Sequence, residues 1–193
     1  AADLAVQSTQ ERYTQLHFDE RNSPMSDHTK ILVRNAREQD IPAVLEIEAE
    51  TASQTAATQE GFQQRMRVFP NGFIILVADN EIAGFGCSEK WLDEHEPQPD
   101  LTPMATHQPD GRIFFITALA VKKKFQGRGY RSALLEKLIE TAHLEGCRKV
   151  VLETAQNQDL YLERGFKTVQ NRSKRGISLD VMSLDLAFIS RIP

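Results

Sequence analysis

Residues 113–145 contain the sequence feature that most constrains the fold: a buried strand, a basic turn and an amphipathic helix in direct succession. The apolar run Ile113–Val121 is long enough, and rich enough in β-branched residues, for a buried strand. From Ser132 onward, apolar residues recur with the spacing of one helix face. The first-turn amides of a helix have no partner within it, and the helix dipole adds partial positive charge there. A strand, turn and helix in this order can therefore bind an anion such as a phosphate group.

The turn at 122–129 supports this interpretation. Gly127 and Gly129 let the main chain approach a phosphate without an intervening Cβ atom. Cations are concentrated here, at Lys122, Lys123, Lys124, Arg128 and Arg131. The pattern lacks the Gly-Lys-Ser/Thr of a P-loop and the third small residue of the dinucleotide fingerprint. The alternative interpretation is a plain strand-to-helix connection with a solvated basic face.

Composition narrows the class of partner. The net charge of −4 over 193 residues argues against general nucleic-acid binding, so the basic cluster is expected to bind a small anion. Cys87 and Cys147 have neither metal nor redox spacing, and we expect reduced thiols and no metal. No apolar run is long enough to span a membrane, and the N-terminus lacks a signal-peptide pattern. We therefore expect a cytoplasmic protein without membrane contact.

The chain is expected to consist of an N-terminal extension, residues 1–29, and one domain, residues 30–193. Strands are predicted at 31–34, 73–78, 82–90, 113–121, 150–152, 166–171 and 177–186, and helices at about 41–50, 58–68, 130–145 and 157–164. This order predicts an α/β (α+β) fold with a mixed sheet and helices on both faces. The connection 91–111 is rich in proline and acid and is expected to be a functional or disordered loop.

Two motifs and the order of elements resemble the GNAT acetyltransferases. Residues 126–131, Gln-Gly-Arg-Gly-Tyr-Arg, resemble the acetyl-CoA signature of that family, Gln/Arg-x-x-Gly-x-Gly/Ala, except that Arg131 replaces the final Gly or Ala. Residues 160–166 resemble its Tyr-x-x-x-Gly-Phe element. The resemblance covers about residues 31–187. It implies the GNAT acyl-CoA N-acyltransferase fold, with a mostly antiparallel twisted sheet, and acetyl-CoA as co-substrate.

The resemblance also implies which residues bind acetyl-CoA. They are Leu119, Ala120 and Val121 at the strand end, Gln126, Gly127, Arg128, Gly129, Tyr130, Arg131 and Ser132 in the turn and helix start, and Asn157. Asn157 follows the next strand and could instead cap the helix after it.

Within the superfamily, this chain resembles the arylalkylamine N-acetyltransferases. They share a long third-to-fourth strand loop with a His-x-Pro-x-Gly segment, here residues 107–111. They also carry two histidines on the fourth strand, where this chain has Phe115 and Thr117. The resemblance thus implies amine acetylation (EC 2.3.1.-) more strongly than an aromatic amine.

The acceptor is expected to be a small primary amine, aryl or polyamine-like, that attacks acetyl-CoA directly in a ternary complex. Trp91 and the acidic residues 93–100 could receive such an amine. A protein lysine or N-terminus as acceptor, and a non-catalytic acyl-CoA-binding module, are the alternatives. The sequence leaves a homodimer open.

Catalytic residues are assigned partly by resemblance. Tyr161 is expected to protonate the departing CoA thiolate, and a core tyrosine is the alternative. A main-chain N–H of Leu119 or Val121 is the expected oxyanion donor.

The general base is less well defined. Glu153 follows the core of a strand and is the candidate, although an ion pair at a strand end is equally expected. For Glu89 a solvated edge charge is the favoured interpretation. His95 and His107 are expected to be surface histidines.

Overall fold

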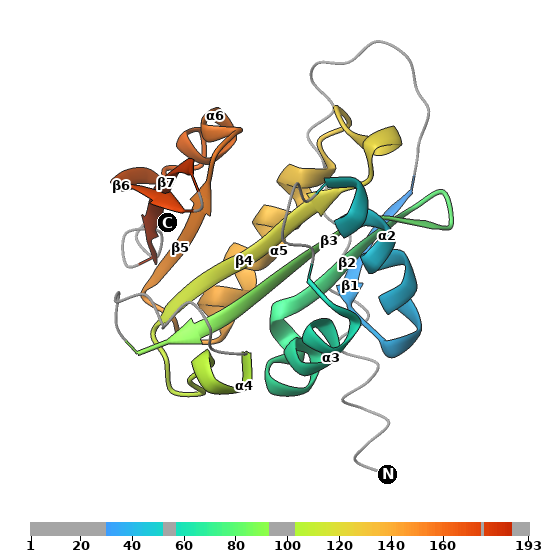
Figure 1. Cartoon of the computed structure of the whole chain (residues 1–193), viewed down its shortest axis with the longest axis horizontal. Coiled ribbons are helices and arrows are strands. Elements are labelled where there is room, and N and C mark those ends of the chain that lie inside the picture. The colour runs from blue at the N-terminus through green and yellow to red at the C-terminus, as the bar shows by residue number, and fades with distance from the viewer. Residues whose placement is uncertain (1–29, 52–56, 93–102, 175, 187–193) are drawn as a thin grey trace, which may run out of the picture.

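The computed structural model describes residues 30–51, 57–92, 103–174 and 176–186. Seven strands form one sheet in the order β1-β2-β3-β4-β5-β7-β6 (Figure 1). They are β1 (Ile31–Asn35), β2 (Phe73–Ala78), β3 (Glu81–Trp91), β4 (Ile113–Val121), β5 (Lys149–Thr154), β6 (Lys167–Lys174) and β7 (Ile177–Asp185). Only β4 and β5 pair in parallel. The predicted mixed, mostly antiparallel sheet is confirmed.

The described helices lie on both faces of this sheet. They are α2 (Ile41–Thr51), α3 (Gln59–Val68), α4 (Pro103–Thr106), α5 (Tyr130–Leu144) and α6 (Gln158–Leu162), with short 3-10 turns at Glu38–Asp40, Pro70–Gly72 and Lys123–Phe125. Helices α2 and α3 cover one face and α5 covers the other (Figure 1). Helix α4 falls in the connection predicted to be a loop. One helical turn is too short to produce an apolar period.

Two hydrophobic clusters follow from this layering. Successive side chains of a strand point to opposite faces, so Ile74 and Leu76 of β2 pack in the cluster beneath α5, while Phe73 and Ile75 pack beneath α2 and α3. All four are essentially inaccessible to solvent. A strand buried on both faces has no polar alternation, which explains the continuous apolar run of β2.

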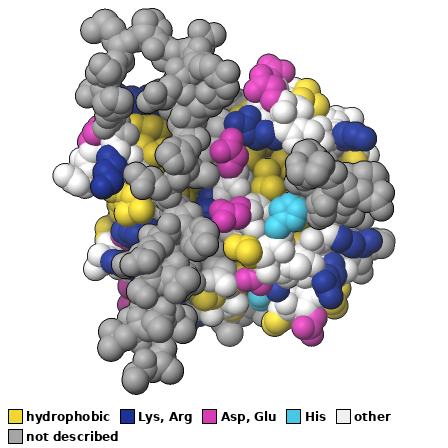
Figure 2. Space-filling model, turned by 180° about the vertical axis from the view of Figure 1, so that it is seen from behind, with side chains coloured by type: hydrophobic (Ala, Val, Ile, Leu, Met, Phe, Trp, Pro, Cys, Tyr) yellow, Lys and Arg dark blue, Asp and Glu magenta, His cyan; other side chains and the backbone are white. Residues whose placement is uncertain are grey.

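The surface carries both signs of charge. On the face shown in Figure 2, acidic and basic side chains are interspersed and hydrophobic side chains form only small groups. None of the described helices combines the length and apolar character that crossing a membrane requires. The predicted N-terminal extension, residues 1–29, lies outside the described residues.

Asp40 fixes the entry into α2. Its side chain is only 3% exposed and accepts hydrogen bonds from Arg34 of β1, at 2.8 and 3.0 Å, and from the main-chain N–H of Arg37 at 2.7 Å. Burial opposes the charge of Asp40, but these bonds outweigh it and lower the pKa of the carboxyl. Asp40 therefore ties the first strand to the first helix.

We expect Asp40→Asn to lower the free energy of unfolding by about 1–3 kcal/mol at neutral pH, because it removes a buried charged partner. A carboxyl with a lowered pKa contributes its full stability above the unfolded-state pKa of about 3.9 and loses it as the pH falls through the folded-state pKa. The difference between wild type and variant should therefore shrink in acid. Denaturant unfolding against pH measures this, with the exposed Glu38→Gln as control; a difference independent of pH would contradict the assignment.

Candidate functional site

The site is built around the separation of β4 from β5. The two strands pair from Ile113–Lys149 to Ile116–Leu152, and no further. Residue Thr117 is bulged, because Ser88 of β3 pairs with Ile116 and the preceding Cys87 pairs with Ala118. A bulge adds a residue to one strand and increases its local twist. Past this point β4 continues to Val121 while β5 turns toward α6, and the strands diverge (Figure 1).

A cavity of about 360 Å³ occupies the space between the two strands, a size typical of small-molecule sites. Its wall includes five of the predicted site residues: Leu119, Arg131, Glu153, Asn157 and Tyr161. They come from β4, α5, β5 and the start of α6. The structure thus brings together both predicted catalytic side chains and part of the predicted cofactor set.

Along β4, the main-chain N–H groups point alternately toward β3 and toward this cavity. The N–H of Lys122 donates to the carbonyl oxygen of Ala83 in β3 at 2.8 Å. Because successive strand residues alternate in direction, the N–H groups of Leu119 and Val121 point the other way, toward the diverging β5. The Gln126 side chain bonds the Val121 carbonyl oxygen at 3.0 Å and ties the turn to the strand end. Ala120 instead packs beneath α2 and α3.

The turn before α5 leaves its main chain accessible. Gly127 and Gly129 both have a φ of 77°, and a Cβ atom added to either would meet no atom within 4 Å. Gly129 is the N-cap and has no side chain to satisfy the first-turn amides of Tyr130, Arg131 and Ser132. These amides and the open glycines fit a phosphate group. The side chain of Tyr130 is buried beside Phe125, so only its main chain can serve such a ligand.

The basic cluster of the turn is partly neutralised. Lys122 forms ion pairs with Glu46 at 2.9 Å and with Glu81 at 3.1 Å, and Lys124 also pairs with Glu81. Hydrogen bonds from both lysines lower the pKa of Glu81. Arg128 lies over the Phe125 ring, 5.4 Å from its centroid. The turn therefore offers an anion fewer cations than the five that the sequence predicts.

Tyr161 of α6 is buried and contributes to the cavity wall. Its ring packs edge-on against Phe166 at a centroid distance of 5.8 Å. Burial raises the pKa of the Tyr161 phenol, and the nearby Arg131 guanidinium opposes this only partly. The phenol is therefore protonated at neutral pH. Arg131, which departs from the family signature, contributes its side chain to the same cavity.

Glu153 and Asn157 occupy the opposite wall. Glu153 lines the cavity and forms an ion pair with Arg172 of β6 at 3.1 Å, as the strand-end interpretation predicts, while its role as a base stays a prediction. Asn157 is the N-cap of α6, but its side chain makes no capping hydrogen bond. It is exposed and borders the cavity instead.

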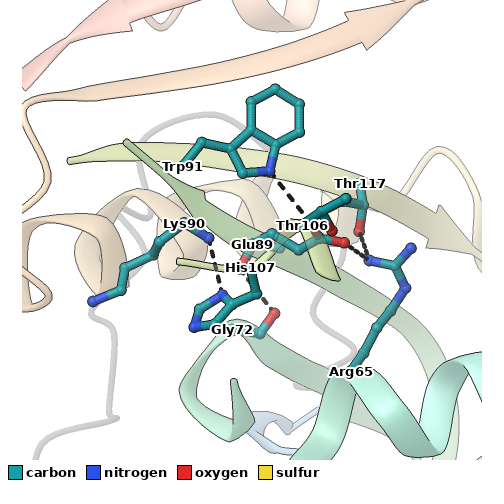
Figure 3. A network of polar contacts seen from close by, with 9 residues as sticks. Arg65, Gly72, Glu89, Lys90, Trp91, Thr106, His107 and Thr117 are labelled. Atoms are coloured by element: carbon teal, nitrogen blue, oxygen red, sulfur yellow. Dashed lines mark hydrogen bonds and ion pairs between the residues drawn. The ribbon is translucent and has the colours of Figure 1, made fainter. Parts of the chain in front are cut away.

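A buried polar network borders the cavity on the α3 side (Figure 3). Glu89 is 4% exposed and accepts hydrogen bonds from Arg65 Nη1 at 2.7 Å, from Trp91 Nε1 at 3.4 Å and from the Thr106 hydroxyl. Arg65 Nη1 also donates to Thr117 Oγ1 at 2.9 Å. The prediction of a solvated Glu89 is wrong, because α3 and α4 cover β3 here.

His107 is buried rather than on the surface. Its Nδ1 accepts the Lys90 N–H at 3.2 Å, and its ring stacks on Phe69 at 4.9 Å. Burial lowers the pKa of His107, so the ring is neutral at neutral pH. The adjacent Gln108 N–H bonds the Lys90 carbonyl oxygen at 2.8 Å. His107 therefore fastens the connection to β3, while His95 lies outside the described residues.

Arg65, Thr106 and the bulge at Thr117 were missed as site features. Arg65 lies on a helix whose docking on the sheet no local pattern reveals. Among the described residues, no group of three or more His, Cys, Asp and Glu side chains is placed to hold a metal ion.

We expect Gly127→Ala to weaken acetyl-CoA binding by about tenfold or more, because a methyl group would stand where the phosphate approaches. Its positive φ also predicts a loss of about 1 kcal/mol in stability. Gly176→Ala is the matched control: Gly176 has a φ of 78° and equally open surroundings in the β6–β7 hairpin. Calorimetric titration with acetyl-CoA and thermal unfolding separate the two effects. Equal affinity in both variants would contradict the phosphate site.

Comparison with known proteins gives a family match. Residues 36–166 match the model of the family described as "Acetyltransferase (GNAT) family". A search of curated proteins found no match.

Solved structures share the fold at low sequence identity. The loading GNATL domain of CurA from Lyngbya majuscula superposes with a TM-score of 0.72 and 17% identity, over 82% of this chain and 99% of that domain. The ribosomal-protein-S18-alanine N-acetyltransferase from Escherichia coli superposes with a TM-score of 0.60 and 20% identity, over 81% of this chain and 94% of that chain. The yncA protein from Salmonella typhimurium, solved with its cofactor acetyl-CoA, superposes with a TM-score of 0.60 and 20% identity, over 81% of this chain and 94% of that chain.

Proposed function

This chain belongs to the GNAT acetyltransferase family, and we propose that it transfers the acetyl group of acetyl-CoA to the nitrogen of a small primary amine. One observation carries the proposal. The cavity between β4 and β5 has in its wall both Tyr161, a protonated phenol, and Arg131, which lies in the first turn of α5 directly after the open glycines.

The predicted cofactor residues suggest how acetyl-CoA would lie. Its phosphates would meet Gly127, Gly129 and the first-turn amides of α5. Its extended arm would run along the main chain of Leu119 and Val121, whose N–H groups point toward β5. The thioester would then lie in the cavity, where the Leu119 N–H can stabilise the negative charge that develops on the carbonyl oxygen. Asn157 would contact the cofactor from the opposite wall.

Acetyl transfer requires that the amine lose one proton and that the departing CoA thiolate gain one. A primary amine is mostly protonated at neutral pH and must lose a proton before it can attack a carbonyl carbon. Glu153 is the carboxylate in the cavity wall, and we propose it as the base, acting directly or through water. Arg172 holds its side chain in place. Tyr161 then donates its proton to the departing thiolate.

The surroundings support an aryl amine over a polyamine. The buried Trp91 stacks at a centroid distance of 4.0 Å on the half-buried Phe115, which lies two residues before Thr117 of the cavity wall, so the neighbourhood of the cavity is aromatic. Glu89 and Glu153, the carboxylates at or beside the cavity, are each paired with an arginine. A polycation would gain little there.

We expect Tyr161→Phe to lower kcat by about 100-fold while the acetyl-CoA dissociation constant changes less than about twofold, because only proton donation is lost. The raised pKa of Tyr161 keeps it protonated through neutral pH, so wild-type activity should fall only above the usual phenol pKa of about 10. CoA thiol release with an aryl amine acceptor, measured against pH, checks both. An unchanged kcat would exclude the tyrosine from the mechanism.

The same assay tests the function itself. A pool of aryl amines, polyamines, amino acids and peptides is offered with acetyl-CoA, and CoA release is recorded. Release with a small amine supports the proposal, whereas release with peptides alone would identify a protein acceptor. Tight acetyl-CoA binding without any transfer would indicate a binding module.

A further inference from the structure

Arg65 has hydrogen-bonding capacity that its described contacts do not use. A guanidinium carries five N–H donors in a planar fork. Arg65 directs Nη1 to Glu89 and Thr117, and its other terminal nitrogen points away from Glu89 (Figure 3). Within residues 30–51, 57–92, 103–174 and 176–186, neither that nitrogen nor Nε has a hydrogen-bond partner. The side chain is 21% exposed, so these donors can reach a ligand.

Thr117 provides a second donor next to this fork. Its side chain lies in the wall of the cavity, at the bulge of β4. Because Thr117 Oγ1 accepts its bond from Arg65, the hydroxyl hydrogen is not used in that contact. Thr117, in the cavity wall, and Arg65, which bonds it at 2.9 Å, thus present two kinds of donor close to one another.

Glu89 and its partners hold the fork in place. The carboxylate is buried, and the bonds from Trp91 and Thr106 fix its position, so Arg65 Nη1 has a single favourable orientation. An arginine already oriented loses less conformational entropy when a ligand binds. A polar site built in this way is suited to planar anions, which arginine binds through two parallel bonds.

The charge balance of the cavity points in the same direction. Glu89 and Glu153 are both engaged by arginines. Arg131, in the cavity wall, forms no ion pair with any carboxylate in the described part of the chain. Glu153, the one carboxylate among the described residues that line the cavity, is thus paired with Arg172, so an anionic acceptor meets no unpaired negative charge in that wall.

From this arrangement we infer that Arg65 and Thr117 form a subsite for a carboxylate close to the acceptor amine, so that the acceptor is an amino acid or an amine of similar design. This inference rests on the proposed function and names the substrate class for the same site. Glu89 is a positioning residue for Arg65.

The test compares acceptors that differ only in the carboxylate. Tyrosine, tyrosine amide and tyramine are offered with acetyl-CoA, and kcat/KM is measured by CoA release. We expect wild type to favour tyrosine by about tenfold or more, the size of a charge-assisted hydrogen bond. Peptides beginning with aspartate or asparagine form a second arm, which distinguishes a side-chain carboxylate at a peptide N-terminus from the carboxylate of a free amino acid.

Variants then locate the preference. Arg65→Gln alone would leave the buried charge of Glu89 without its ion-pair partner. The double variant Arg65→Gln/Glu89→Gln is therefore used, because it keeps a neutral pair of similar shape. We expect it to bring the ratio of kcat/KM for tyrosine to kcat/KM for tyramine close to one. Thr117→Val should lower the ratio in part, and Arg65→Lys should lower it because the planar fork is lost. Arg67→Gln, on the exposed side of α3, should leave it unchanged.

Binding gives a readout that does not depend on turnover. Calorimetric titration of tyrosine and tyramine in the presence of CoA should show the same preference, and the same loss in the double variant. Equal affinity of wild type for both compounds, or a double variant that keeps the preference, would overturn the subsite. A preference in binding without acetylation of any amine would leave the subsite standing and overturn the proposed function.

Discussion

The candidate site of this molecule depends on the separation of β4 from β5. β4 and β5 form the only parallel pair in the described sheet, and their pairing stops at Ile116 and Leu152. An unpaired main-chain group away from water is costly, so a sheet normally closes such a gap. Here the bulge at Thr117 keeps it open, and α5 and α6 buttress the two sides. The exposed β4 main chain, the cavity and the acceptor-side network all follow from that interruption.

The two sides of the cavity recognise ligands by different means. The cofactor side relies on main-chain groups and glycines, which carry no side-chain identity and depend on the course of the backbone. The acceptor side relies on side chains held by ion pairs, Glu89 with Arg65 and Glu153 with Arg172. Buried pairs of this kind contribute orientation more than stability. Under the proposed function, a change of acceptor would therefore require changes in only a few side chains and none in the strand and turn proposed to bind acetyl-CoA.

Local patterns in the sequence were sufficient to predict the strands and the longer helices, but not the short α4 or the contacts between elements. The strand, turn and helix at 113–144 were predicted because apolar period and glycines are local signals. Glu89 was misjudged because its burial depends on Arg65, 24 residues earlier, and Arg65 reaches Thr117 over 52 residues. Lys122 and Lys124 were counted as ligands for an anion, yet Glu81, more than 40 residues earlier, neutralises both. A sequence alone does not show which charged side chains pair with one another or how deeply they are buried.

The close contact of Gly111 with β3 affects how far the connection after β3 can vary in length. A Cβ atom at this position would lie 2.6 Å from both the main-chain nitrogen and oxygen of Trp91, so the connection returns in direct contact with the residue from which it leaves β3. The bonds of His107 and Gln108 to Lys90 secure the same closure. Once two ends are joined, doubling the number of residues between them costs only about 0.6 kcal/mol in chain entropy. The chain entropy of this closure therefore changes little when residues are added between Leu92 and Pro103, whereas α4 is held in place by the bond from Thr106 to Glu89.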